Sequence, residues 1–392
     1  MTQLTRLCAA FTFVVLTLPA LAEDAPALAT PQVDQSNAIS LLSKAVEHFD
    51  ELTQLPESHW VRRDQDSATR DITNLIEDAL EVLDIPELSS IRNQYRQVED
   101  RIRDEELALA ELREKRLLAP EGDAGTLTRW TPTETLRNFT ARTRGDFEML
   151  VEIRQGNVEA YRDELAQLRR TLAEQLRKID INMPPDQVEL WLSSAIGNDV
   201  ISMSVVFNSI HTITERLEEL THESGENLSF AKRYYGMVVI LHKLVVHMQN
   251  SFVEKVDNDI LPRLEEFQAE ADEIIAESRR LIREGGNRTT LETNIAANEL
   301  TKQAISLYQR VVRGQRDKVA DALAISRREE SVAINTYRTV SLSANVAGLI
   351  RDGLSTFETL SNLQVPDTAN FENAEVREEF RQLTERLSAS SR

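Results

Sequence analysis

The chain has 392 residues, a formal net charge of −20, 41% hydrophobic and 5% aromatic residues, and only 12 glycines, 11 prolines and one cysteine. The acidic balance argues against a general nucleic-acid binder, which needs clustered cations to displace counterions from phosphate. The single cysteine excludes a disulfide framework and a cysteine-rich zinc site, and the scarcity of turn residues argues against sandwiches, barrels and propellers.

Residues 1–22 have the features of a secretory signal peptide. Arg6 supplies the positive charge, residues 7–18 are apolar, and residues 20–22 form a small-x-small cleavage pattern. The apolar run is shorter than the roughly 20 residues that span a bilayer, so we expect cleavage, with an uncleaved anchor as the alternative. Cleavage removes Arg6 and Cys8 and no acid, which changes the net charge from −20 to −21. An exported chain without cysteine is typical of the bacterial periplasm.

Residues 23–33 are expected to form a flexible leader, and residues 34–180 a set of N-terminal helices that includes a coiled-coil hairpin. Helical periodicity covers almost all of the chain after the leader, and strand alternation is nearly absent. Helices are expected at about 34–55 and 64–83. Two longer helices follow, at about 86–118 and 133–179.

The two longer helices carry heptad repeats, in which apolar residues recur at alternating steps of three and four. Glu105 interrupts the first repeat, and Arg154 and Gln175 interrupt the second. A stretch rich in Gly, Pro and Asp joins the helices, which predicts an antiparallel coiled coil. The repeat positions are Ile91, Tyr95, Val98, Ile102, Leu109 and Leu112, and then Phe147, Val151, Val158, Tyr161, Leu165, Leu168, Leu172 and Ile179.

Residues 181–258 hold the most apolar stretches of the chain and are expected to form a compact helical core. The stretch 237–246 is too short to span a membrane and is interrupted by His242 and Lys243. A buried helix therefore explains it better than a membrane segment.

Residues 259–392 are expected to form a C-terminal coiled coil of long helices, followed by a short terminal helix. After a turn at 285–287, a long helix could run as far as residue 363, and a helix at 371–387 could fold back. The first heptad repeat of this region steps without a fault. Its positions are Ile260, Leu264, Phe267, Ala271, Ile274, Ser278 and Leu281.

No residue set has the spacing that catalysis or metal binding requires. Four histidines, His211, His222, His242 and His247, fall in the apolar middle region. His242 and His247 are five residues apart, so their side chains diverge by about 140° on a helix, and no HExxH motif or cysteine accompanies them. Nucleophile elbows and phosphate-binding loops are also missing. We therefore predict no enzyme, no catalytic, cofactor-binding or metal-binding residue, and no cofactor.

The segment Lys232–Met237 combines two cations with Tyr234 and Tyr235 just before the apolar helix. Such a cluster could line a ligand site or a partner contact, but it more often lies at a core edge, where the cations reach water. Tyr234, Tyr235, His242 and His247 are the residues that we would mutate first, although we assign none of them to a site.

Together these patterns predict an all-α, elongated protein of long antiparallel coiled-coil helices packed with a compact helical middle region. We expect a non-enzymatic periplasmic scaffold or adaptor of the bacterial cell envelope, with other envelope proteins as partners and the coiled-coil helices available for homo-oligomer contacts. One alternative is a soluble accessory or sensing subunit of an inner-membrane channel, transporter or proton-driven motor. Another is a helical small-molecule or lipid binding protein that uses the apolar middle region.

Overall fold

The computed structural model describes residues 34–52, 55, 64–125, 140–224, 228–342, 380–384 and 386–387. Within these residues the protein is all-α, without a single strand. The expected signal peptide (1–22) and leader (23–33), and the expected helix beyond residue 342, lie outside them. Residues 31–392 form one compact unit.

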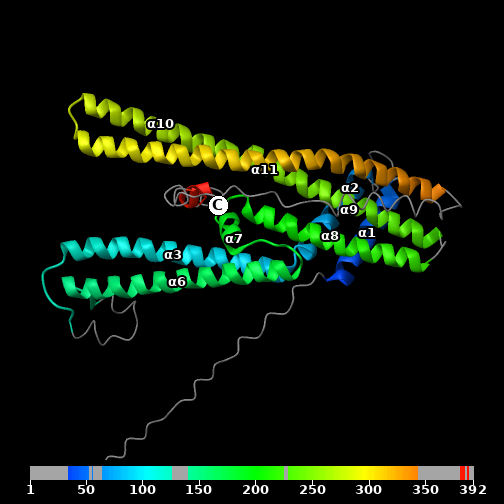
Figure 1. Cartoon of the computed structure of the whole chain (residues 1–392), viewed down its shortest axis with the longest axis horizontal. Helices are drawn as coiled ribbons and strands as arrows, with labels where there is room; N and C mark the ends of the chain where they lie inside the picture. The colour runs from blue at the N-terminus through cyan, green and yellow to red at the C-terminus, as the bar shows by residue number, and fades with distance from the viewer. Residues whose placement is uncertain are drawn as a thin grey trace, which may run out of the picture. The chain divides into compact units, whose positions relative to one another are not determined.

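Figure 1 shows the helices of the described residues in their spatial arrangement. Their bounds in chain order are α1 (Gln35–Leu52), α2 (Gln65–Leu83), α3 (Pro86–Leu118), α6 (Arg144–Lys178), α7 (Pro185–Leu192), α8 (Gly197–Ser224), α9 (Leu228–Lys255), η1 (Val256–Ile260), α10 (Leu261–Arg283) and α11 (Arg288–Leu342).

Neighbouring residues in the sequence determine the conformation of the junction between α2 and α3. Pro86 occupies the first turn of α3, where its missing N–H costs nothing. The preceding residue, Ile85, has a φ of 51°, a left-handed conformation that costs a β-branched residue about 1–2 kcal/mol. Its side chain is almost completely buried, which offsets that cost. Beside it, Asp84 accepts a hydrogen bond from the buried Arg92; burial raises the pKa of Asp84, and the Arg92 charge only partly opposes this.

Helices α3 and α6 pack along each other, and their polar heptad positions meet. All six apolar repeat positions expected in α3 are buried. Glu105 Oε2 accepts a hydrogen bond from Arg154 Nη1 at 2.8 Å, and Glu105 Oε1 accepts one from Asn157 Nδ2 at 3.3 Å. The residues that interrupt the two repeats therefore satisfy each other. Gln175 is also buried, and its Oε1 has no hydrogen-bond partner in the part of the chain that is described.

The start of α6 differs from the expected one near residue 133. The helix begins at Arg144, because Thr143 and Asp146 form a capping box. The Asp146 carboxylate also accepts hydrogen bonds from the backbone N–H groups of Gly125 and Arg142, at 2.7 and 3.0 Å. One buried carboxylate thus ties the helix start to residues near both ends of the segment between α3 and α6.

Helices α9, η1 and α10 form one continuous helical run, and the boundary expected near residue 258 lies inside it. The run contains Pro262, which cannot donate a hydrogen bond and whose ring clashes with the carbonyl four residues earlier in an α-helix. The π-helical turn η1 accommodates this ring: the Leu261 N–H donates to the Val256 carbonyl, five residues back.

The buried face of α10 differs from the predicted one at one position. Ile274 is 39% exposed, whereas Ile275 is 2% exposed, so the prediction for Ile274 was wrong. Leu264, Ala271 and Ser278 are buried as expected. A straight α-helix repeats every 3.6 residues rather than every 3.5, so the buried face lies one residue later between these positions.

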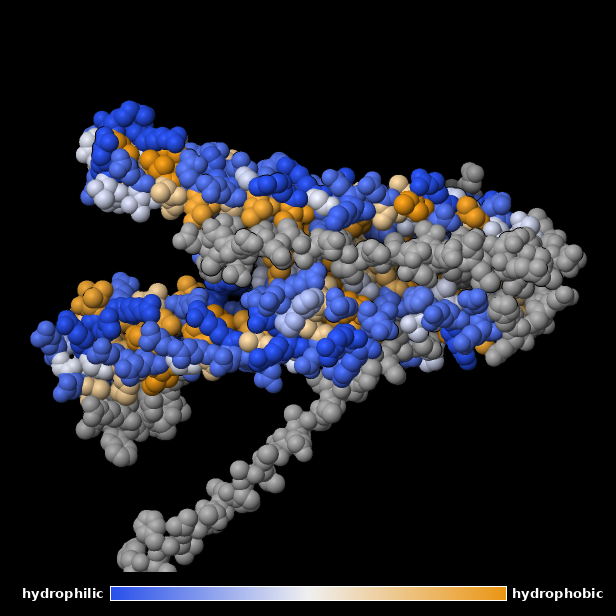
Figure 2. Space-filling model, in the orientation of Figure 1, coloured by the Kyte–Doolittle hydropathy of each residue, from blue (hydrophilic) through white to orange (hydrophobic). Residues whose placement is uncertain are grey.

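Buried side chains gather mainly around two centres. The first, which we call the Trp191 core, joins the facing ends of α3 and α6 with α7, α8, the end of α9, η1, α10, α11 and residues 380–384 and 386–387. The second, the Tyr235 core, joins α1, α2, α8, α9 and the C-terminal part of α11. In Figure 2 the visible surfaces of α3, α6, α10 and α11 are mostly hydrophilic, with scattered hydrophobic residues. Among the described residues, no helix is long and apolar enough to cross a bilayer.

Candidate functional site

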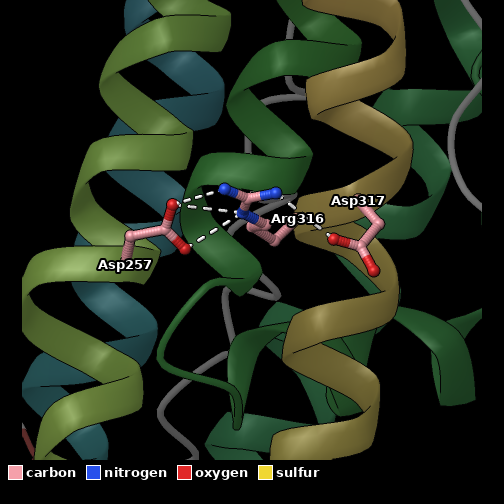
Figure 3. Close-up of polar contacts among 3 residues, drawn as sticks. All are labelled: Asp257, Arg316 and Asp317. Atoms are coloured by element: carbon pink, nitrogen blue, oxygen red, sulfur yellow. Dashed lines mark hydrogen bonds and ion pairs between the residues drawn. The ribbon is translucent and has the colours of Figure 1, made fainter.

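The π-helical turn is held to α11 by a two-pronged ion pair (Figure 3). Arg316 Nε donates to both carboxylate oxygens of Asp257, at 3.0 and 3.1 Å, and Arg316 Nη2 donates to Asp257 Oδ2 at 2.6 Å. Asp317 Oδ1 accepts from Arg316 Nη1 at 3.4 Å. These hydrogen bonds, above all those to Asp257, raise the pKa of the Arg316 guanidinium above its usual value. The paired planar groups fix the rotation of the turn about its axis.

A second carboxylate of the same turn orients an arginine toward the end of the chain. Arg263 Nη1 donates to Asp259 Oδ1 at 3.2 Å. Arg263 Nη2 donates to the backbone carbonyls of Arg386, at 3.3 Å, and of Leu387. Arg263 therefore links the carboxylate of Asp259 in the turn to two backbone carbonyls near the end of the chain.

Residues 380–384 and 386–387, which we call the C-terminal segment, dock at this place. They are helical, and Phe380, Leu383 and Leu387 are all buried in the Trp191 core. Their spacing of i, i+3 and i+7 puts the three side chains on one face of a helix. The expected terminal helix at 371–387 thus has a docked end, and its earlier part lies outside the described residues.

Tyr308 of α11 lies at the centre of the contact and is fully buried. Its hydroxyl accepts a hydrogen bond from the backbone N–H of Ala195 at 2.6 Å and pairs with Thr384 Oγ1 at 3.0 Å. Thr384 Oγ1 in turn donates to the Ser193 carbonyl at 2.8 Å. Burial raises the pKa of the Tyr308 hydroxyl, which stays protonated and available as a donor to Thr384. The ring of Tyr308 contacts the ring of Phe380, with centroids 3.7 Å apart.

Arg386 completes the contact from the segment's side. Its guanidinium lies 4.2 Å from the centroid of the Phe267 ring and donates to Glu270 on α10. Stacking on an aromatic face and pairing with a carboxylate are the interactions for which arginine is better suited than lysine. Phe267 was expected to face the partner helix of α10, but it also serves the C-terminal segment.

The Lys232–Met237 segment lies at the edge of the Tyr235 core. Lys232 Nζ donates to Asp50 Oδ2 and the Tyr337 hydroxyl donates to Asp50 Oδ1, both at 2.8 Å. Burial alone would raise the pKa of Asp50, but these two hydrogen bonds and the Lys232 charge together hold it below its usual value. Tyr235 is buried and Tyr234 is half-buried. The segment therefore connects α9 to α1 and α11.

The described side chains of His211, His242 and His247 do not form a common site, and the side chain of His222 lies outside the described ones. His242 is 1% exposed, and neither of its ring nitrogens has a hydrogen-bond partner among the described residues. Burial lowers its pKa to about 4. His242 is therefore a buried core histidine on the apolar face of α9. His247 Nε2 lies 3.7 Å from Glu77 Oε1, and His211 Nε2 lies 3.3 Å from Glu215 Oε1. Within the described ranges, no cluster of His, Cys, Asp and Glu could hold a metal ion.

Sequence reasoning did not single out Tyr308, Arg263 or Ala195. The only signal for the docking site was the amphipathic spacing of the terminal helix, because its acceptor residues come from segments far apart in the chain. Comparisons with protein-family models, with curated proteins and with solved structures each find no match.

Proposed function

We propose that the protein is a non-enzymatic, periplasmic coiled-coil scaffold or adaptor of the bacterial cell envelope. The observation that carries the proposal is the pairing of long helices. α3 and α6 contain 33 and 35 residues, and α11 contains 55. At ~1.5 Å per residue these lengths correspond to roughly 50 Å for α3 and roughly 80 Å for α11. Helices of this length are suited to holding other components at a distance.

The proposal treats α3–α6 and α10–α11 as antiparallel coiled coils. Cross-helix ion pairs support this orientation. In the first pair, Glu106 meets Arg162 and Arg116 meets Glu148. In the second pair, Glu265 meets Arg313 and Asp272 meets Lys302. In both pairs the residue numbers rise along one helix as they fall along the other. These exposed pairs add little stability, but they favour one register over its alternatives.

The proposed compartment is supported by the sequence of the first 22 residues and by the absence of cysteine after them. Other envelope proteins, including inner-membrane complexes, are the proposed partners. Contacts between copies would use the charged outer faces of the paired helices.

Fractionation of cells tests the location. We expect the chain in the periplasm with residues 1–22 removed, as read by N-terminal sequencing, and a variant without residues 1–22 in the cytoplasm. Retention of the native chain in the cytoplasm would contradict the proposal.

Small-angle scattering of the mature protein tests the scaffold. A compact domain of this size has a radius of gyration of about 21 Å, and we expect a clearly larger value. A measured value near that of the compact domain would exclude a spacer role. Crosslinking in intact cells, followed by mass spectrometry, would then identify the partners.

A further inference from the structure

We propose that the surface around Tyr308, Ala195, Arg263 and Phe267 is a helix-binding site, which the C-terminal segment occupies as an internal ligand and which takes an amphipathic helix of a partner protein in its place. The proposal goes beyond the scaffold function and does not depend on the compartment. It rests on the contacts of the described segment and on its position in the chain.

The first argument is the distance along the chain between the segment and the helix on which it docks. Tyr308 precedes Leu342, the last residue of α11, by 34 residues, which is roughly 50 Å of helix. The 37 residues between 342 and 380 could span at most about 120 Å. The covalent connection therefore does not force the segment onto the site, and the docking depends on side-chain contacts, as the binding of a separate helix would.

The second argument is that the contacts specify a ligand in detail. The apolar anchors at i, i+3 and i+7 are Phe380, Leu383 and Leu387. The hydroxyl of Thr384, at i+4, pairs with the buried Tyr308 hydroxyl at 3.0 Å. Arg386, at i+6, pairs with Glu270 over the Phe267 ring. An amphipathic helix that carries these groups in this order would make the same contacts, which is the usual mode of helix recognition by a surface.

The third argument concerns the end of the ligand. Arg263 donates hydrogen bonds to the backbone carbonyls of Arg386 and Leu387. Helix carbonyls lack a partner within the helix only in its last turn. The partner helix should therefore end at or just after its third anchor. Asp259 holds Arg263 by its other amino group, so the π-helical turn presents this donor before any ligand arrives.

The experiment uses the full-length chain and two labelled peptides. The first peptide copies residues 375–392. The second places only Phe, Leu, Thr, Arg and Leu, at i, i+3, i+4, i+6 and i+7, on an Ala/Lys/Glu helix that ends after the last anchor. Binding is followed by fluorescence anisotropy. The receptor is the full-length Phe380→Asp/Leu383→Asp variant, in which the internal ligand no longer competes.

Both peptides should bind this variant at least tenfold more tightly than the wild-type chain, because the occupied fraction of the site lowers the apparent affinity. The matched control is Leu107→Asp/Leu117→Asp, which adds the same charge at two exposed leucines of α3 and should bind like the wild type. Thr384→Val in the first peptide should weaken binding about tenfold, since it removes the peptide's hydrogen bond to the buried Tyr308 hydroxyl. A minimal peptide with anchors moved to i, i+4 and i+8 should not bind.

Equal binding to the wild type and to the Phe380→Asp/Leu383→Asp variant, when circular dichroism shows that both are folded, would overturn the proposal. If that variant does not fold, hydrogen exchange on the wild-type chain decides. Excess minimal peptide should speed exchange of the amides at 380–387 and leave those of α10 and α11 protected, and an unchanged rate would overturn the proposal. If the chain formed concentration-dependent dimers that the same peptide dissociates, the site would bind a second copy of the chain. That result would also contradict the proposal of a helix from a partner protein.

Discussion

The two long helix pairs, α3–α6 and α10–α11, differ in how well the heptad repeat of the first helix predicts which of its residues are buried. The repeat of α3 is interrupted by Glu105, yet every apolar position expected in it is buried. The repeat of α10 has no interruption before Ser278, yet Ile274 is exposed and Ile275 is buried instead. α3 packs mainly along α6, whereas α10 contacts both α11 and the C-terminal segment. A regular repeat identifies the buried face best where a helix has a single main partner.

Glu105, Arg154 and Asn157 form a polar layer between α3 and α6. The largest expected effect comes from removing one member of this layer. Glu105→Ala leaves the Arg154 guanidinium in the seam without its carboxylate, and we expect a loss of about 3 kcal/mol in the free energy of unfolding. Urea denaturation measures it. The exposed pair offers the control, since Glu106→Ala should cost less than about 1 kcal/mol.

The double variant Glu105→Leu/Arg154→Leu separates pairing from burial. Apolar residues of similar size in place of a buried ion pair are often neutral or stabilising, so this variant should unfold close to the wild type. If it were as unstable as Glu105→Ala, the seam would need the polar layer itself, and the comparison between the two helix pairs would have to be revised.

The next effect tests the buried face of α10 directly. Ile275→Ala should lower the free energy of unfolding by about 3 kcal/mol, because it removes buried methyl groups and leaves a cavity. Ile274→Ala should cost well under 1 kcal/mol, because that side chain is already 39% exposed. Equal losses in the two variants, measured by urea denaturation, would show that the uninterrupted repeat was the better guide.

The third prediction concerns the effect of pH on α9, which packs along α11 as α10 does. His242 has a pKa of about 4 in the folded protein and about 6.5 when unfolded. The unfolded chain therefore binds more protons between these values, and stability falls as the pH drops through that window. We expect this residue to lower the free energy of unfolding by about 2 kcal/mol between pH 7.5 and pH 5.

Thermal unfolding at the two pH values measures this loss, and His242→Leu should remove most of the difference. Hydrogen exchange at pH 5 locates it: protection should fall first in α9 and the adjoining part of α11, while α3 and α6 keep theirs. An identical pH dependence in wild type and variant would assign the acid sensitivity to other groups.

The smallest effect is expected where α1 joins the C-terminal part of α11. Tyr337→Phe removes one hydrogen bond to Asp50 and leaves Lys232 in place, so the loss should be about 1 kcal/mol. The pKa of Asp50 is lowered, and such a carboxylate contributes stability above its unfolded pKa and loses it as the pH falls through the folded one. The difference between wild type and variant should therefore shrink below about pH 3.8. A difference that stays constant down to pH 2 would show that the hydroxyl stabilises through another contact.

The fold class and most helix bounds could be predicted, because heptad spacing and the few prolines mark faces and ends locally. Pro86 and the interrupted repeat of α3 are examples. The docking site could not be predicted in the same way. Tyr308 and Ala195 lie 113 residues apart, and no periodicity connects them. The surroundings of His242 could not be predicted for a related reason: a helical pattern places a residue on an apolar face, but it does not show whether a polar partner lies opposite.

The π-helical turn also affects how α11 can pack. An added residue in a helical repeat rotates everything after it by about 100°, so α9 and α10 are two helices of different phase in one continuous run. α11 packs along both of them without a break of its own. The proline and its turn therefore act as a phase correction, which lets one uninterrupted helix follow two apolar stripes that would otherwise point in different directions. Deleting Asn258, the exposed residue of the turn, would cancel this correction and keep the side chains of Asp257 and Asp259 that contact Arg316 and Arg263.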